Sequence, residues 1–590
     1  MLPTQVFQLF LFCIFSPLSS AAPQCKVLPG SQEWPSQTDW EDLNDKVEGN
    51  LLRPSAPAAP CHPDQSSYDP AECDRILAGW QDTDWHSNHP TSTMWQNYND
   101  FSCMPNINAS CSTAGYPIYV IAAKTAKHVK AGVDFARTKN IRLNIKSSGH
   151  CFLGRSVQPN SLSIWTRDLK SQVWFEESFT PQHCNPIKGP AITVGAGSQW
   201  GELYEAADER DLMLVGGASD TVSVGGYIGG GGHSSLSPKY GMGADMVLEL
   251  EAVTADGRVV IANECQNEDL FWALRGGGGS TFAAVLTYTL KAIPSVPVAT
   301  WSGYIVGWDN IVRLHTKWPA LAEAGVGGYL SGYPGRYPYL YLSASMPGAI
   351  SSFELKDLLE PILHPKLNLN SVVESSNPTQ RRRRSTDSTP SGTYSWYSNF
   401  RGFRTSPDFA PEARKLTLNR RDTFPGIGMG KLIVSWLWSA EDVAKPGLED
   451  ALRGSIDPSV WYLNDLIAGA GTANPPYIRG GGNAVNPAWR TAVMRPASEL
   501  QWDDPEETVQ KKQDGLRFGA SLRSLSPDGG TYGNEADPDT ANWQYAFWGT
   551  NYKRLLGFKQ KVDPDGVFHC RRCVGSELWI DDSKGQLCPV

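Results

Sequence analysis

The pattern of apolar and polar residues predicts that the first part of the chain alternates strands with helices. Residues 117–123 and 141–145 are short runs, apolar or alternating, of the kind that form strands. Between them, residues 125–138 carry apolar side chains at helical spacing and predict an amphipathic helix. Residues 191–195 and 199–210 repeat the strand and the helix. Such alternation is typical of α/β layering.

The later part of the chain has a mixed pattern. From residue 294 to 525, strand-like segments such as 432–437 occur beside helical segments such as 311–324, which predicts a second domain. Residues 530–575 are expected to return to the first domain, which is then discontinuous. Residues 25–113 contrast with both parts. They are rich in Pro, Asp and Cys, have few periodic runs, and predict an extension that wraps the core.

Composition limits the classes of protein and partner. At 590 residues the chain is too long for one ordinary core, which agrees with two domains. Hydrophobic residues make up 41% and charged residues 19%, a balance typical of a globular protein. The formal net charge of -9 argues against nucleic acid or an anionic membrane as a partner.

The N-terminus predicts export from the cell. Residues 6–17 form a short apolar run and residues 18–21 supply the small side chains of a cleavage site, so we expect a signal peptide over residues 1–21. The run is too short to anchor the protein in a bilayer, and the mature protein is expected to be soluble and secreted. Asn108 begins the sequon Asn-Ala-Ser and is a candidate glycosylation site.

Cysteine usage agrees with an oxidising compartment. Of the 12 cysteines, Cys13 lies in the expected signal, and most of the others occur close together in the sequence. The close groups are Cys61 with Cys73, Cys103 with Cys111, and Cys570 and Cys573 near Cys588. We expect disulfides among them, with connectivity left open, and Cys151 as the unpaired thiol. A zinc site at Cys570-x-x-Cys573 lacks a second pair of ligands, so no metal is expected.

Three glycine-rich loops carry the candidate chemistry. The first, at residues 146–156, follows the strand 141–145 and presents His150 at its tip. The others are residues 225–233 and 274–280. None matches a P-loop or a G-x-G-x-x-G fingerprint. Loops of this kind let backbone N–H groups approach a large anion, which indicates a bulky phosphate-bearing cofactor.

These loops resemble the FAD-binding module of the vanillyl alcohol oxidase superfamily, and more narrowly the berberine bridge enzyme-like oxidases of fungi. The resemblance rests on Ser147-Ser148-Gly149-His150 and on four further segments, and it covers most of the chain from about residue 115. The further segments are residues 221–232, 239–245, 269–279 and the tail at 532–537 and 551–564. Residues in the middle third match least.

The resemblance implies an α+β fold. It predicts a two-part PCMH-type FAD-binding domain, formed by residues 114–293 and a returning segment at 530–590. A separate substrate-binding domain, residues 294–529, is expected to be an antiparallel sheet covered by helices. The signal peptide and an extension at residues 22–113 precede them.

The resemblance further implies FAD linked covalently through His150, from a ring nitrogen to the 8α-methyl carbon of the flavin. The alternative is a histidine that packs beside a phosphate loop. Many relatives carry a second tether, a cysteine, where this chain has Ser219, so attachment through one residue is expected. The expected cofactor-binding residues are Ser147, Ser148, Gly149, His150, Gly154, Arg155, Ser156, Thr221, Gly225, Gly226, Gly230, Gly231, Gly232, His233, Tyr240, Asp245, Asn534 and Asn551.

Some of these positions have a structural alternative. His233 either contacts the flavin or its phosphates or is a structural histidine, and Asp245 is expected to cap backbone N–H groups or bind a ribose hydroxyl. Relatives usually carry Gly-Asn-Phe-Gly where this chain has Ser-Thr-Phe-Ala at residues 280–283, which predicts altered packing near the flavin.

Flavin oxidases remove a hydride from carbon while a base takes a proton from the adjacent O–H or N–H. By resemblance Tyr532 is the leading candidate for that base, with Glu535 and Asp537 next. The alternative for all three is a hydrogen-bond network that fixes the tail. Val222 follows the threonine of the second loop, where relatives control oxygen access, and valine resembles the oxidases.

Two enzymatic functions remain open, with a small-molecule substrate and oxygen as partners. One is an oxidase of a small alcohol or a secondary-metabolite intermediate; the other is a carbohydrate oxidase acting at the anomeric carbon of an oligosaccharide. A flavin-bearing binding protein with little turnover is a third class. Residues 381–384 are four consecutive arginines within a Ser-, Thr- and Pro-rich segment, which indicates either a solvated loop or a processing site.

Overall fold

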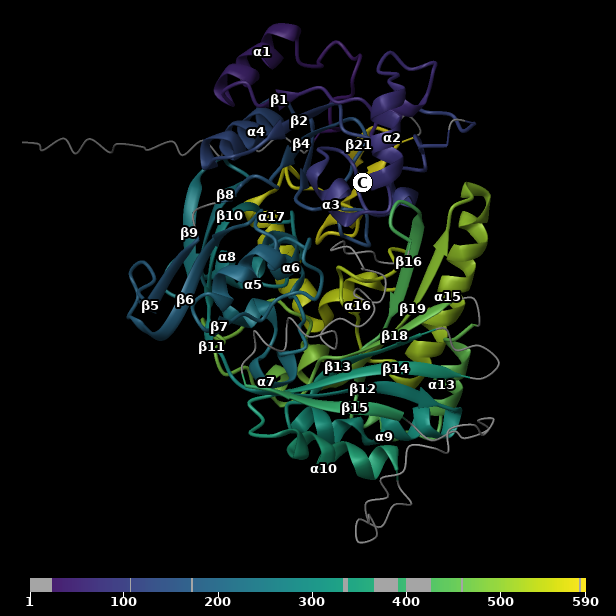
Figure 1. The fold of residues 1–590 in the computed structure, drawn as a ribbon. Coiled ribbons are helices and arrows are strands. Elements are labelled where there is room, and N and C mark those ends of the chain that lie inside the picture. Colours follow the sequence, from purple (N-terminus) through teal and green to yellow (C-terminus); the bar gives the residue numbers. More distant parts are fainter. Residues whose placement is uncertain are drawn as a thin grey trace, which may run out of the picture.

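The structure is a computed structural model, and its fold is α+β. It describes residues 24–106, 108–170, 173–332, 338–364, 391–398, 426–457, 460–582 and 585–590. Within these residues the sheets contain four, five and eight strands, with two further two-stranded pairs. Figure 1 shows the two smaller sheets on one side of the molecule and the large sheet on the other. The expected signal peptide and the arginine run at residues 381–384 lie outside the described residues.

The four-stranded sheet begins the first half of the molecule. Its order is β1 (Leu51–Leu52), β2 (Tyr119–Ala122), β4 (Ser161–Trp165) and β3 (Arg142–Lys146), and β2 and β3 both run parallel to β4. Helix α4 (Ala126–Thr138) covers it and begins where the Thr125 hydroxyl accepts the His128 N–H. A Cβ at Gly132 would meet Ile121 and Ile164 at 2.7 and 2.9 Å, so glycine lets this helix lie close to the sheet.

The five-stranded sheet is antiparallel throughout. Its order is β5 (Trp174–Phe179), β6 (Ile187–Gly195), β10 (Ala283–Lys291), β8 (Val247–Thr254) and β9 (Val259–Asn263). A short pair, β7 (Leu212–Met213) with β11 (Ile293–Pro294), lies beside it. The strand expected at residues 191–195 is therefore not part of a parallel α/β layer. The local alternation of strand and helix identified the elements correctly but not the sheet that they join.

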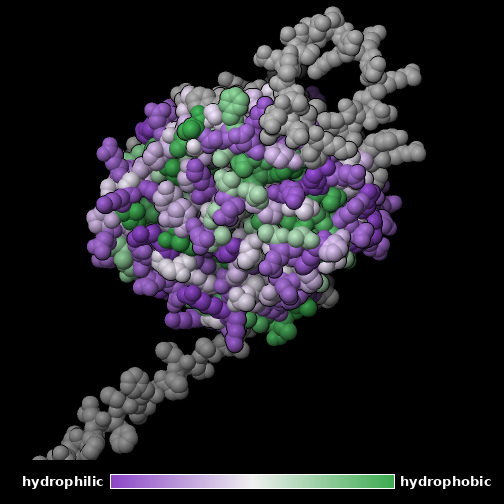
Figure 2. Space-filling model, turned by 90° about the horizontal axis from the view of Figure 1, so that it is seen from below, coloured by the Kyte–Doolittle hydropathy of each residue, from purple (hydrophilic) through white to green (hydrophobic). Residues whose placement is uncertain are grey.

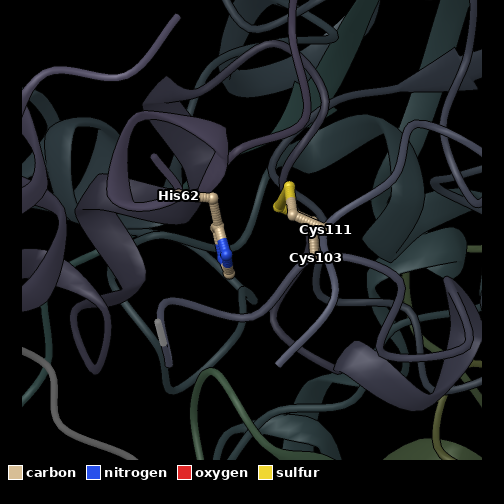
Figure 3. Close-up of side chains that lie close together, drawn as sticks. All are labelled: His62, Cys103 and Cys111. Carbon is tan, nitrogen blue, oxygen red and sulfur yellow. A yellow bond between two sulfur atoms is a disulfide. The ribbon is translucent and has the colours of Figure 1, made fainter. Parts of the chain in front are cut away.

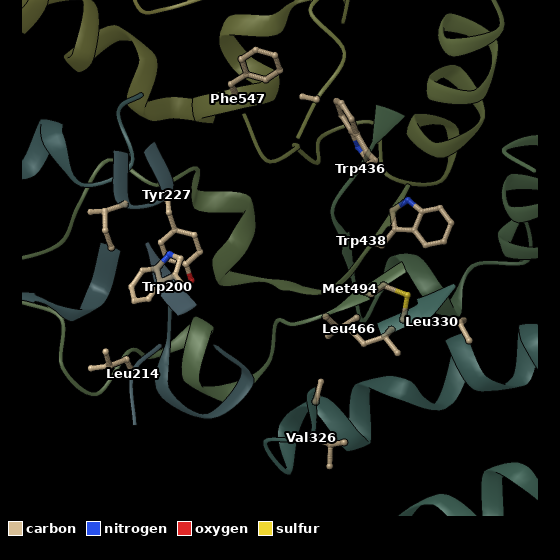
Figure 4. Packing of buried hydrophobic residues seen from close by; sticks show 14 of the residues in the cluster. Trp200, Leu214, Tyr227, Val326, Leu330, Trp436, Trp438, Leu466, Met494 and Phe547 are labelled. Atoms are coloured by element: carbon tan, nitrogen blue, oxygen red, sulfur yellow. The ribbon is translucent and has the colours of Figure 1, made fainter. Parts of the chain in front are cut away.

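Short helices connect these strands and pack into the main core. They are α5 (Trp200–Asp208), α6 (Val224–Gly230), α7 (Ser237–Tyr240), η3 (Gly243–Met246) and α8 (Glu268–Leu274). Figure 4 shows Trp200 and Tyr227 next to each other. Their rings pack edge to face, with centroids 4.9 Å apart. The Tyr227 hydroxyl donates to the carbonyl of His233 at 2.7 Å, which fixes the loop after α6.

The eight-stranded sheet forms the second half and is antiparallel. Its path runs β15 (Ser391–Tyr397), β12 (Val298–Val306), β14 (Tyr339–Pro347), β13 (Gly327–Gly332), β18 (Trp461–Leu466), β19 (Ala492–Trp502) and β16 (Gly430–Ser435), with β17 (Trp438–Ser439) also paired to β19. Helices α9 (Trp308–Glu323) and α10 (Ser352–Leu363) cover its lower side in Figure 1. Helices α13 (Leu448–Gly454) and α15 (Thr508–Leu525) pack together beside β16 and β19.

Short helical segments complete this half and lead into the tail. They are η4 (Asp442–Ala444), α14 (Ala470–Ala473), η5 (Pro487–Arg490) and η6 (Pro505–Glu507). The tail then forms α16 (Trp543–Trp548), η7 (Gly549–Asn551), α17 (Tyr552–Val562), η8 (Ser576–Leu578) and the pair β20 (Trp579–Asp581) and β21 (Leu587–Pro589). It lies against the first half: the Phe152 N–H donates to the carbonyl of Asn534 at 3.1 Å, and Arg155 donates to the carbonyls of Arg571 and Arg572.

The N-terminal extension is held to the rest by one disulfide, Cys25–Cys588, and by packing. Its elements are α1 (Gln37–Lys46), η1 (Ala59–Cys61), α2 (Pro70–Gly79), α3 (Thr83–Asn88) and η2 (Gln96–Tyr98). Two further disulfides, Cys61–Cys73 and Cys103–Cys111, lie within the extension, and Cys184–Cys265 and Cys570–Cys573 lie outside it. Cys588 thus pairs with Cys25 at the other end of the chain, and Cys151 is the free cysteine of the described residues, as predicted.

The surface agrees with the composition. The face in Figure 2 is mainly hydrophilic, with hydrophobic side chains in small separate groups. Among the described residues, no helix combines the length and the apolar character needed to cross a bilayer.

Candidate functional site

A cavity lies between the glycine-rich loops of the first half and the inner face of the eight-stranded sheet. One wall is built by residues 147–152 after β3 and by residues 222–229 around α6. The opposite wall is built by side chains of β13, β14, β16, β18 and β19. The tail closes one side with Tyr532, Asn534 and Glu535. Three parts of the chain that are far apart in sequence therefore form one site.

His150 is held in a fixed orientation on the first wall. Gly149 before it has φ +93°, a conformation that favours glycine and turns the chain out of β3. The His150 Nε2 lies 2.8 Å from the Thr221 hydroxyl, and the Trp95 indole donates to the His150 carbonyl at 3.3 Å. Burial lowers the pKa of His150 to about 3, so the ring is neutral and keeps a lone pair on one nitrogen.

A buried lysine lies beneath this loop. Lys146, the last residue of β3, points its ammonium at the carbonyls of His89, His86 and Ser87, at 2.9, 3.3 and 3.4 Å. Burial lowers the pKa of Lys146 to about 7. These carbonyls belong to the extension, so the extension is part of the support of the cofactor loop.

The first wall fits a phosphate-bearing cofactor such as FAD. The Ser147 hydroxyl is buried and has no hydrogen-bond partner within the described part of the chain, although its residue lines the cavity. The Arg155 guanidinium is buried and bonds to two backbone carbonyls, with no ion pair to a carboxylate among its described contacts. A Cβ at Gly226 would meet nothing within 4 Å, so the cavity approaches the backbone there. A free hydroxyl, an unbalanced cation and accessible backbone together suit an anionic group.

The structure places most of the expected cofactor residues along this wall. Lining the cavity are Ser147, Ser148, Gly149, His150, Arg155, Ser156, Gly225, Gly226, His233 and Asn534, together with Val222, Tyr532 and Glu535. Thr221 is not in the lining but bonds to His150. Ser219 and Cys151 also line the cavity.

Two expected residues have other contacts. Tyr240 packs in a small core with Met213 and Leu236 rather than against the cavity. Asp245 is buried, pairs with Arg490 at 2.8 Å and accepts the Met242 N–H at 2.8 Å. Asp245 therefore caps backbone, one of the two roles expected for it, and it does not line the cavity.

Several other expected residues also lie outside the lining. Asn551 donates to the carbonyl of Val485 at 3.0 Å, just before α17. Gly154 packs against Tyr98. The run Gly230 to Gly232 ends α6, where Gly231 and Gly232 have φ of +112° and +68°. Its glycines serve the turn and the close approach of neighbouring side chains, including that of Asn534.

A compact group of charged side chains, here called the acid cluster, lies at the junction of the tail and the large sheet. The acid cluster consists of His233, Asp465, Arg495 and Glu535. Arg495 Nη2 contacts both carboxylates. The His233 Nε2 lies 3.3 Å from Glu535 Oε1 and 3.9 Å from Asp465 Oδ2. Because a carboxylate only accepts hydrogen bonds, the Nε2 atom carries the proton in the bond to Glu535.

The two carboxyl groups of the acid cluster differ in environment. The Glu535 side chain is 26% exposed and lines the cavity, whereas that of Asp465 is 1% exposed. Burial raises the pKa of Asp465, against the effect of Arg495. Burial also acts on Glu535, but the positive charges of Arg495 and His233 lower its pKa to about 2. Of the two groups, Asp465 is therefore the one more readily protonated, and Glu535 is the one more readily ionised.

Tyr532 lies beside the acid cluster. Its ring is 5.1 Å from that of His233, and its hydroxyl accepts a hydrogen bond from Asn534 at 3.0 Å. Burial raises the pKa of Tyr532, so the hydroxyl keeps its proton near neutral pH. Asp537, the third candidate base, does not line the cavity; its carboxylate accepts the Asp539 N–H at 2.8 Å.

The large sheet contributes residues that the sequence pattern did not identify. They are Tyr329 and Ser331 on β13, Tyr341 and Ser343 on β14, Lys431 and Ile433 on β16, Trp461, Leu463 and Asp465 on β18, and Glu499 on β19. Within each strand they are two residues apart and so share one face. That spacing was the available signal, but it does not say which face meets the cavity.

Lys431 joins three parts of the cavity wall. Its ammonium lies 2.7 Å from the Glu499 carboxylate, and both side chains are largely buried. The same ammonium lies 4.9 Å from the ring of Trp95 and 5.6 Å from that of Phe152. Trp95 belongs to the extension and Phe152 to the His150 loop. The pair therefore fixes charge and shape at the end of the cavity that the extension closes.

Three residues of types that can bind metals lie close together, apart from the cavity. Figure 3 shows His62 facing Cys103 and Cys111, whose sulfur atoms are bonded to each other. A disulfide offers no thiolate, and the His62 Nε2 lies 2.7 Å from the carbonyl of Met104. The disulfide and the contact of His62 with the carbonyl of Met104 therefore give these three residues a structural role.

Comparison with known proteins gives two family matches. Residues 117–263 match the model described as FAD binding domain, and residues 531–574 match the model described as Berberine and berberine like. The first match includes the His150 loop and the second includes Tyr532 and Glu535.

Whole-length relatives agree. The VAO-type flavoprotein oxidase VAO615 of Thermothelomyces thermophilus is 33% identical, over 96% of both chains. The bifunctional decalin synthase calF of Penicillium decumbens is 32% identical, over 98% of both chains. The crystal structure of MtVAO615 from Myceliophthora thermophila C1 superposes with a TM-score of 0.83 at 32% identity, covering 96% of this chain and 100% of that one. Berberine bridge enzyme from Eschscholzia californica has the same fold, with a TM-score of 0.64 at 19% identity, covering 91% and 98%.

Proposed function

Because this chain belongs to the berberine bridge enzyme-like FAD-linked oxidoreductases of the vanillyl alcohol oxidase family, we propose that it is an oxidase of a small alcohol or a secondary-metabolite intermediate. The observation that carries the proposal is one cavity lined by both His150 and Glu535. Bound FAD would supply the oxidising chemistry: it would accept a hydride from the substrate carbon, and oxygen would take the two electrons to give hydrogen peroxide.

The chain's own residues hold the cofactor at the first wall. His150 binds the flavin covalently through one ring nitrogen, and Thr221 keeps the other nitrogen occupied at 2.8 Å. Ser147, Arg155 and the backbone at Gly226 face the anionic part. Ser219 offers no thiol, so attachment is through one residue.

The remaining wall binds and orients the substrate. The side chains on β13, β14, β16 and β18 combine hydroxyl groups with aromatic rings, and Lys431 with Glu499 gives one end a charged pair. The acid cluster reaches the cavity through Glu535, and it receives the proton that the substrate loses. A relative named a decalin synthase supports a secondary-metabolite substrate.

The proposal includes secretion. The described residues contain five disulfides, a number typical of proteins made in an oxidising compartment. Asn108 is exposed, as a glycosylation site must be.

A second candidate is a carbohydrate oxidase acting at the anomeric carbon. Tyr341 and Trp461 favour it, because both aromatic side chains line the substrate wall and such rings suit the flat faces of sugars.

Peroxide release separates these functions. The full chain is incubated under oxygen with a panel of alcohols, oligosaccharides and candidate metabolites. Peroxide with an alcohol or metabolite supports the first proposal, and peroxide with oligosaccharides supports the second. The absence of turnover with every compound, together with slow reoxidation of the reduced enzyme by oxygen, contradicts both.

A further inference from the structure

The acid cluster joins the cavity to a buried carboxyl group. Glu535 is its accessible member, whereas Asp465 is buried on β18 between two neighbouring strands. Tyr329 lies opposite Asp465 on β13 and Arg495 lies opposite it on β19. The two carboxyl groups are therefore linked through Arg495, with His233 Nε2 close to both.

The two carboxyl groups of the acid cluster share their partners. Arg495 contacts both carboxyl groups, so one guanidinium serves two acids in a buried position. The Oδ1 atom of Asp465 has no hydrogen-bond partner within the described part of the chain. Burying an unpaired charge is costly, and one added proton removes this cost.

Resting on the proposed oxidase function, we propose that the acid cluster is the proton acceptor of the reaction, with Glu535 at the substrate and Asp465 as the site that holds the proton. The substrate carbon loses a hydride to the cofactor, and the substrate O–H or N–H bond breaks. Its electron pair forms the new double bond to carbon, and its proton goes to Glu535. From Glu535 the proton passes to Asp465 by way of His233 Nε2, which lies 3.3 Å from Glu535 Oε1 and 3.9 Å from Asp465 Oδ2 and ends in the protonation state in which it began. The acid cluster as a whole gains one proton.

The neighbours of Asp465 decide which group holds the proton. Arg495 and His233 favour its ionised form, while Glu535 opposes it and burial favours the neutral form. Tyr329 and Tyr532 carry neutral hydroxyls, because burial raises the pKa of each. Arg495 contacts both carboxyl groups, so burial makes the difference between them. Asp465, which has no access to water, is thus better suited than Glu535 to hold a proton.

This arrangement assigns different roles to residues that the sequence could not connect. Glu535 touches the substrate. Asp465, His233 and Arg495 act through it and are positioning residues. The Tyr532 hydroxyl keeps its proton and is a hydrogen-bond donor to substrate rather than the final acceptor.

Asp465→Asn tests the proposal, because it keeps the shape and removes one negative charge. We expect the rate of cofactor reduction to fall by about 100-fold or more, the range general-base catalysis supplies. The rate is measured by rapid mixing with the compound that gives the fastest peroxide release. The low-pH loss of this rate should move to lower pH, because removing a negative charge lowers the pKa of the remaining groups. Reoxidation of dithionite-reduced enzyme by oxygen should be unchanged.

Two variants provide comparisons. Glu535→Gln should slow reduction at least as much. Asp442→Asn changes a buried aspartate of the same domain that pairs with Lys445 outside the cavity, and should change reduction less than threefold.

A second measurement needs no substrate. Infrared titration of the oxidised holoenzyme should show a protonated-carboxyl band that titrates above the ordinary aspartate pKa of about 4. The band should be lost in Asp465→Asn and kept in Asp442→Asn. If it persists in Asp465→Asn, or if that variant reduces its cofactor at the wild-type rate and pH profile, the proposal is overturned. If Asp465→Asn does not fold, the titrating band of the wild type and its shift in Glu535→Gln test the proposal instead. A wild-type protein that lacks the band overturns the proposal. A protein that turns over no compound contradicts the oxidase function alone.

Discussion

His150 and Thr221 are joined by a 2.8 Å contact between the imidazole Nε2 and the hydroxyl Oγ1, across 71 residues of sequence. The contact connects the first glycine-rich loop with the second. It occupies one ring nitrogen and holds the neutral ring in one orientation. We therefore expect the flavin bond to form at the Nδ1 atom.

The first prediction concerns this tether. Wild-type protein precipitated with acid should stay yellow, and proteolysis should give a flavin-bearing peptide that contains His150. His150→Ala should release its colour on denaturation. Thr221→Val should lower the fraction of covalently bound flavin, because it leaves Nε2 without its partner, whereas Thr221→Ser should retain it. Complete release of flavin from denatured wild type would exclude the tether.

The second prediction is attachment through one residue. Ser219 lies within 3.4 Å of the Thr221 hydroxyl and lines the cavity, at the position where relatives carry a second link. The mass of the flavin peptide should show one protein bond. Ser219→Cys supplies a thiol at this place and should give a second bond in part of the protein. A cross-link to Cys151 in the wild type would contradict this interpretation.

The loops that contain His150, Gly226 and Asn534 were predictable from sequence because their chemistry is local. A glycine run after a strand has few structural uses, and backbone that must approach an anion excludes larger residues. The helix predicted at residues 125–138 was accessible to sequence reasoning for a similar reason, since its apolar positions repeat at helical spacing. Its observed bounds are Ala126–Thr138.

The acid cluster was not predictable in the same way. Asp465 meets Arg495 only because β18 and β19 pair in one register, and a shift of either strand by one residue would turn its side chain to the other face. Sequence periodicity shows which residues share a face but not which strand lies beside which. Tyr240 and Asp245 were assigned to the cofactor by their position in a matching motif, yet that motif also builds the core beneath the site.

The third prediction concerns stability and pH. Burial raises the pKa of Asp537 to about 6, above its ordinary value, so the folded protein binds the proton more tightly than the unfolded chain. The resulting contribution to the free energy of unfolding is of the order of 2–3 kcal/mol. It is complete below about pH 4 and is lost as the pH rises through about 6. In Asp537→Asn this part of the pH dependence should be absent.

Chemical denaturation at several pH values between 4 and 7 measures the difference. Asp528→Asn, at an exposed position, serves as the matched control and should follow the wild type. Equal pH dependence in the wild type and Asp537→Asn would contradict the assignment. Asp537 lies outside the cavity lining, so its variant should keep the ability to bind FAD.

The fourth prediction concerns Ser280, where relatives usually carry glycine. Its φ is +60°, a left-handed conformation that side chains with a Cβ adopt at a cost. Ser280→Gly should therefore stabilise the protein by up to about 1 kcal/mol, since glycine removes the strain but gains entropy in the unfolded chain. Ser280→Ala keeps the Cβ and should give no gain. Denaturation midpoints at one pH compare the three proteins, and an equal gain in both variants would argue against strain as the cause.

The last prediction concerns oxygen. Val222 lines the cavity beside Thr221 and packs against the main core, and its carbonyl accepts the Trp200 N–H at 3.1 Å. Leucine is larger by one methylene, and in a closely packed wall one methylene can fill the space that oxygen needs beside the flavin. Val222→Leu should therefore slow reoxidation of the reduced enzyme by at least tenfold. Reduction by substrate should change much less, because the acid cluster is untouched. Val222→Ala is the matched control, since it enlarges the space and should reoxidise at least as fast as the wild type. Rapid mixing with oxygenated buffer gives all three rates. If the leucine variant reoxidises as fast as the wild type, Val222 is a packing residue and does not control oxygen access.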